Sequence, residues 1–127
     1  MATWDDVERL ALALPETTQR PAWGSRAWRV KDKMFVWERP LRRRDLEELG
    51  DAAPQGPILG AAVEHDGAKR ALIEDDPDVF FTTSHFNGYA AILAQLDRID
   101  EELLREVVTE AWLCRAPKRL ARDYLAG

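Results

Sequence analysis

Few side chains in this sequence have the types and the spacing that catalysis or metal binding requires. His65 and His85 fall in separate predicted turns, and Cys114 follows on a predicted helix. That spacing matches no zinc or iron ligand pattern. The seven glycines are dispersed, so no glycine-rich phosphate loop is present, and no serine has the flanking glycines of a nucleophile elbow. We therefore expect no metal and no cofactor, and we predict a non-enzymatic protein.

Positively charged side chains make a better case for binding. Two clusters are candidate phosphate contacts: Arg42, Arg43 and Arg44, and Lys118, Arg119 and Arg122. The second cluster shares one side of a predicted helix because its members recur at three- and four-residue intervals. The first hypothesis is thus a DNA-binding or regulatory module. The net charge of -5 weighs against it, because the phosphate backbone favours a basic protein, and surface cations also serve solubility alone.

A second set of candidates combines aromatic rings and polar groups in predicted loops: Trp23, His85, Asn87 and Tyr89. Together with the basic final helix, the last three would present donors and a ring to an anion or a nucleotide. If Trp23, His85 and Tyr89 line a groove beside the sheet, the alternative hypothesis is a protein-interaction or small-ligand module with no nucleic-acid role. For Trp23, beside Gly24, the ordinary expectation is a lid over the core.

These candidates depend on elements that the apolar periodicity predicts. A helix is expected from Thr3 to Pro15, and strands are expected over 27–30, 34–39, 58–64, 79–83 and 91–96. Short helices are predicted over 41–49 and 69–75, and two helices follow Asp100, separated by Pro117. Period-two alternation places Phe35 and Trp37 on one face of the sheet.

Every predicted strand link is either a tight turn or a helical excursion too short for a regular crossover. We therefore predict an α+β two-layer sandwich with a mainly antiparallel five-stranded sheet and helices on one face. The length of 127 residues suits one domain, 1–127. The five tryptophans are expected in the core or at its border.

The single cysteine excludes an intramolecular disulfide, and neither a signal core nor a membrane span is present. A cytoplasmic protein with an inert, buried Cys114 is expected.

Three segments, in order, resemble the MmcQ/YjbR family of small bacterial proteins. They are Trp23-Gly24 with 27–30, Phe80 to Thr83 with 85–89, and 116–120. The resemblance implies a YjbR-like, double-wing fold of order α-β(3)-α-β(2)-α and carries the family's label of DNA-binding protein. It implies no catalytic residues. The stretch 41–57 departs from the simplest family pattern, because an arginine-bearing short helix is predicted between strands two and three.

Overall fold

The structure, a computed structural model, describes residues 1–127 and contains five helices and six strands. The helices are α1 (Trp4–Leu12), α2 (Arg43–Leu49), α3 (Asp66–Asp75), α4 (Glu101–Arg115) and α5 (Lys118–Ala126). The strands are β1 (Thr17–Gln19), β2 (Ala27–Val30), β3 (Lys33–Glu38), β4 (Ile58–Ala62), β5 (Phe80–Phe81) and β6 (Ala91–Gln95).

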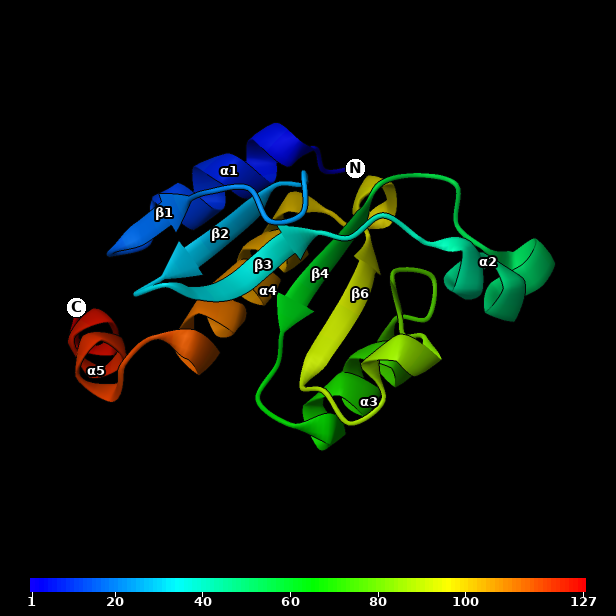
Figure 1. The fold of residues 1–127 in the computed structure, drawn as a ribbon. Coiled ribbons are helices and arrows are strands. Elements are labelled where there is room, and N and C mark those ends of the chain that lie inside the picture. The colour runs from blue at the N-terminus through cyan, green and yellow to red at the C-terminus, as the bar shows by residue number, and fades with distance from the viewer.

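All six strands form one antiparallel sheet in the order β1-β2-β3-β4-β6-β5. Helices α1 and α4 contact each other on one face of this sheet, whereas α2 and α5 lie at opposite ends of the molecule (Figure 1). The predicted α+β class and antiparallel sheet are confirmed, but the predicted five strands are wrong. The added strand, β1, is three residues long, too short to show alternation, and it forms an edge only because β2 pairs with it.

Helix ends follow local capping rules. The Thr3 side chain accepts from the Asp6 amide, and the Asp6 carboxylate accepts from the Thr3 amide, which completes a capping box at α1. Asp100 caps α4 by accepting from the Leu103 amide at 2.7 Å. The N-cap of α3 is His65, whose Nδ1 accepts from the Ala68 amide at 3.0 Å. The predicted helix over 69–75 therefore begins earlier, at Asp66.

The main core lies between the sheet and the pair α1 and α4. Trp28 and Trp112 are fully buried there, and Trp4 stacks on Trp28 with ring centroids 6.4 Å apart. The Trp112 indole N–H donates to the Pro15 carbonyl at 3.1 Å. Trp23 is 87% exposed, so the expectation that all five tryptophans lie in the core or at its border, with Trp23 as a lid, is wrong for this residue.

A bulge in β3 divides its side chains between the two faces of the sheet. Trp28 pairs with Val36, but the next residue, Arg29, pairs with Met34, which leaves Phe35 as an extra residue. Phe35 and Val36 both join the main core, whereas Trp37 packs against a separate cluster. The prediction that Phe35 and Trp37 share a face is thus wrong, because the bulge breaks the period-two alternation.

The opposite face of the sheet, here called the open face, carries a small apolar cluster. Its buried members are Ile58, Phe86, Ala91 and Leu93. Trp37 packs against this cluster from directly across β4, where its partner is Gly60. A Cβ on Gly60 would lie 2.3 Å from the Trp37 ring, so the indole rests directly on the strand backbone. Glycine at this position lets a large ring form the floor of the open face.

Candidate ligand-binding groove

The loop between β5 and β6, residues 84–89, crosses the open face and positions three candidate side chains. A 3-10 turn over Ser84–Phe86 buries the Phe86 ring and turns His85 outward. Gly88 has a φ of 82°, which favours glycine and completes the predicted turn. His85 and Asn87 are exposed and Tyr89 is 63% exposed, so none of the three contributes its side chain to the core.

A buried lysine fixes the backbone of this loop. Lys69 of α3 is 4% exposed, and its Nζ donates to the carbonyl oxygens of Phe86 at 3.0 Å and Tyr89 at 3.3 Å. Sequence reasoning did not single out this residue. The available signal was its position three and four residues before Leu72 and Ile73, which places Lys69 on the apolar side of the helix.

Helix α2 holds the same loop from its other side. The Glu48 carboxylate accepts from the Ser84 amide at 3.0 and 3.1 Å and from the Ser84 hydroxyl at 2.5 Å. Glu48 was not among the residues chosen from the sequence. In the structure it anchors the beginning of the loop to α2, the helix that departs from the simplest family pattern.

A buried ion pair connects α2 with the sheet. Arg39 and Asp45 are 7% and 4% exposed, with Nη2 and Oδ2 3.0 Å apart, and the Arg39 guanidinium lies 5.2 Å from the centroid of the Phe86 ring. Burial by itself would raise the pKa of Asp45, but the Arg42 amide and the Arg39 charge outweigh it and hold that pKa below its usual value. Arg39 thus serves structure and is not free for a ligand.

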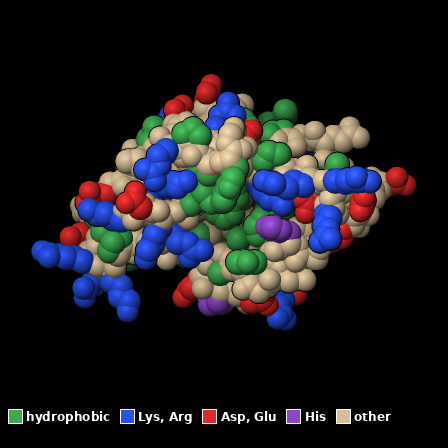
Figure 2. Space-filling model, viewed as in Figure 1, with side chains coloured by type: hydrophobic (Ala, Val, Ile, Leu, Met, Phe, Trp, Pro, Cys, Tyr) green, Lys and Arg blue, Asp and Glu red, His purple; other side chains and the backbone are tan.

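Two adjoining hollows on the open face form the candidate ligand site, here called the groove. They have volumes of about 400 and 220 Å³ and share the residues Met34, Trp37, His85 and Phe86. Trp23 and Arg42 line the larger hollow, and Tyr89 and Arg115 line the smaller one. Figure 2 shows a band of hydrophobic side chains on this face with Lys and Arg side chains along its border.

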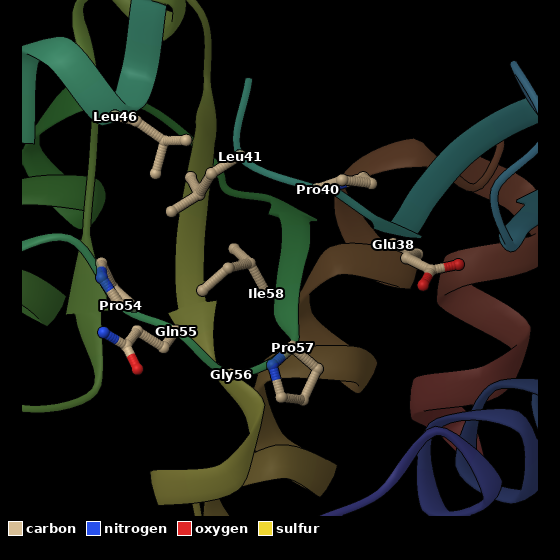
Figure 3. Close-up of a pocket in the computed structure, with 9 residues that line it drawn as sticks. All are labelled: Glu38, Pro40, Leu41, Leu46, Pro54, Gln55, Gly56, Pro57 and Ile58. Atoms are coloured by element: carbon tan, nitrogen blue, oxygen red, sulfur yellow. The ribbon is translucent and has the colours of Figure 1, made fainter. Parts of the chain in front are cut away.

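A third hollow of about 560 Å³ continues from the groove toward α2. It shares Glu38 and Pro40 with the larger hollow of the groove. The side chains of Leu41, Leu46 and Ile58 point into it, from the segment before α2, from α2 and from β4 respectively (Figure 3). Its wall is completed by the segment 54–57, which belongs to the same departure from the family pattern.

Trp23 stands at the tip of a tight hairpin beside the groove. Ala22 and Ser25 exchange two backbone hydrogen bonds of 2.9 Å, and Trp23 and Gly24 between them have φ values of 50° and 78°. Two positive φ values define a type I′ turn, a geometry that suits Asn or Gly and is strained for a bulky residue. An exposed tryptophan at a strained position is a functional candidate, because neither packing nor local conformation favours it.

The basic clusters and the groove coincide only in part. Arg42, Arg43 and Arg44 are exposed near α2, where Arg43 pairs with Glu47 at 3.2 Å. Lys118, Arg119 and Arg122 are exposed on α5, at the other end of the molecule (Figure 1). The final helix therefore does not contribute these cations to the groove beside the loop 84–89, contrary to the expected pairing. Arg115, at the end of α4, occupies that place.

Other candidate chemistry does not assemble in the fold. No group of three or more His, Cys, Asp or Glu side chains is placed so that it could hold a metal ion. Cys114 is partly exposed, so the expectation that it is buried is wrong. Partial burial still raises the pKa of its thiol, so the thiol form dominates at neutral pH. None of the helices has both the length and the apolar composition that a membrane crossing needs.

Comparison with known proteins identifies the family. The YjbR family model matches residues 12–114. Uncharacterized proteins of Mycobacterium tuberculosis and Mycobacterium bovis are 48% identical to this chain over 130 residues, which cover 100% of this chain and 98% of each relative. A crystal structure of the Deinococcus radiodurans protein DR2400, with a DUF419 domain, superposes with a TM-score of 0.70 at 19% identity and covers 99% of this chain and 89% of that one. The chain therefore belongs to the YjbR family, also called MmcQ/YjbR.

Proposed function

We propose that this protein is a non-catalytic binding module that holds its ligand in the groove on the open face of the sheet. One observation carries the proposal: Trp23, His85 and Tyr89, chosen from the sequence, border the same groove while their side chains remain largely exposed. A tryptophan in a strained turn and a rigidly held loop with outward-facing rings suit ligand contact better than packing.

The volumes and lining of the groove agree with this role. Small-molecule sites commonly measure about 300–1,000 Å³ and combine apolar and aromatic walls with a few polar groups. The larger hollow falls in this range, and the smaller one extends it with an apolar floor made by Met34 and Trp37. Asn87, the remaining candidate, is exposed in the loop but does not line either hollow.

A screen of ring-containing fragments, followed by amide chemical shifts in two-dimensional NMR, tests this function. We expect the hits to shift amides of 34–37 and 84–91, and we expect Trp23→Gly or Tyr89→Ala to abolish most of those shifts. Arg105→Gln, on the exposed side of α4, is the matched control and should leave them unchanged. Hits spread over the surface, or confined to another face, would contradict the proposal.

Binding of duplex DNA is the second candidate, and the exposure of both basic clusters favours it. Because the clusters lie at opposite ends of the molecule, a duplex contacting both would have to lie along the protein (Figure 1). Fluorescence anisotropy over a salt series should then show a slope that falls when Arg42, Arg43 and Arg44, or Lys118, Arg119 and Arg122, are replaced by glutamine. Absence of duplex binding at low salt would exclude this candidate.

A further inference from the structure

The charged groups of the groove are divided between those already paired and those left free. Glu38, the only acidic residue lining the two hollows, pairs with Arg26 at 3.3 Å, and Arg39 pairs with Asp45 at 3.0 Å. Arg42 and Arg115 have no ion-pair partner. The groove is thus a locally positive site in a chain whose net charge is -5, and it presents no free carboxylate to a ligand.

The apolar part of the groove is lined mainly by aromatic and other apolar side chains. The smaller hollow, of about 220 Å³, has room for one ring system, and its lining includes Met34, Trp37, Phe86 and Tyr89. Aromatic walls of this kind also bind alkylammonium cations through their ring faces. Here the two free guanidinium groups repel such a cation and attract an anion.

We propose that the groove binds a planar aromatic anion, a small molecule whose ring packs against Met34 and Trp37 and whose carboxylate or phosphate pairs with Arg115 or Arg42. This proposal rests on the proposed function and specifies its ligand class. Arginine matches both anions, because its planar fork donates two parallel hydrogen bonds to a carboxylate or phosphate. Trp23, beside the larger hollow, supplies a second ring face for a ligand that extends toward Arg42.

A charge series on one ring tests the class. The probes are indole-3-carboxylate, indole-3-carboxamide and 3-aminomethylindole, together with adenosine monophosphate and adenosine, titrated by two-dimensional NMR. We expect at least one anion to bind about tenfold or more tighter than its neutral counterpart, as a charge-assisted hydrogen bond would provide. Either Arg115→Gln or Arg42→Gln should bring that ratio close to one, whereas the control Arg105→Gln should preserve it.

The outcomes separate the ligand class from the proposed function. If a neutral or cationic probe shifts the groove amides as strongly as its anion, the class is wrong and the binding function stands. If both anions bind but neither arginine variant lowers the ratio, the assignment of the charged contact is overturned. If none of the five probes shifts amides of 34–37 or 84–91, the ligand class is wrong, and only the fragment screen then supports or refutes groove binding. The spectra themselves confirm that each variant is folded.

Discussion

Replacing Gly60 by alanine sets two physical effects against each other. Glycine inside a strand is usually less favourable than alanine by about 0.5–1 kcal/mol, so local propensity predicts that Gly60→Ala stabilises the protein. A Cβ at this position would instead lie 2.3 Å from Cε2 and Nε1 of Trp37, a distance that real contacts do not reach. Overpacking of this kind costs about 1–3 kcal/mol. We therefore expect a net loss of about 1–2 kcal/mol in the free energy of unfolding.

Urea unfolding followed by far-UV circular dichroism measures this change, and the Trp37→Ala background supplies the control. Without the indole, Gly60→Ala should be neutral or stabilising by up to about 1 kcal/mol, so the double-mutant cycle should give a coupling energy of at least about 1 kcal/mol. If Gly60→Ala is as stable as the wild type, or changes stability equally in both backgrounds, the reasoning that Trp37 rests on this glycine is refuted.

Three further substitutions test the loop, the strained turn and the buried pair. Lys69→Met removes the donor from two loop carbonyls and should cost about 1–3 kcal/mol in urea unfolding; unchanged amide shifts over 84–89 would contradict the role of Lys69. Trp23→Asn should raise stability by up to about 1 kcal/mol, because asparagine tolerates positive φ, while weakening ligand binding in the groove; a loss of stability would argue against strain. The pKa of Asp45 is lower in the folded state than its unfolded value of 3.8. The ionised carboxylate therefore makes its full contribution to folding stability above pH 3.8, and this contribution is lost as the pH falls through the folded-state pKa. Asp45→Asn should therefore be less stable at pH 7, with a flatter stability profile below about pH 4, and an unchanged acid profile would contradict this assignment.

The helices and the sheet class followed from local rules that act within a few residues. Thr3 and Asp100 cap the helices that were predicted to begin at these positions, and Pro117 separates α4 from α5. The apolar spacing of 91–96 yielded a strand with nearly the expected bounds. These features depend on side-chain contacts with the adjacent backbone and on burial of one face, and both can be predicted from the spacing of the residues.

The features that failed depend on partners distant in sequence. β1 is a strand because β2 offers it an edge, and its three residues carry no periodicity of their own. The bulge at Phe35 appears only when the register between β2 and β3 is known. Because of that single insertion, Trp37 does not share a face with Phe35, as predicted, but lies on the open face and lines the groove. A rule that assumes alternation along one strand cannot predict a shift of register between two strands, although here that shift places Trp37 in the candidate site.

Some of the residues that line the candidate site were predicted from the sequence, and others were not. Trp23, His85 and Tyr89 were chosen because loop residues of these types could present rings and hydrogen-bond donors to a ligand, and they do border the groove. Arg115, which lines the groove, was not among the candidates chosen from the sequence. The candidates Lys118, Arg119 and Arg122 lie on α5, away from the groove. The end of α4 relative to the sheet determines which cationic side chains reach the open face. No local sequence pattern predicts that position.

The way in which the loop 84–89 is held argues that its shape matters. A tight turn alone would connect β5 and β6, and burying a lysine or an ion pair commonly costs more than an apolar replacement would. The chain nevertheless places Lys69 under the loop carbonyls, Glu48 on Ser84, and the Arg39–Asp45 pair against Phe86. These contacts order the backbone before any ligand arrives, which lowers the entropic cost of binding to the outward side chains. Contacts with this desolvation cost are not needed to connect two strands, but they are expected where the loop forms one wall of a binding site.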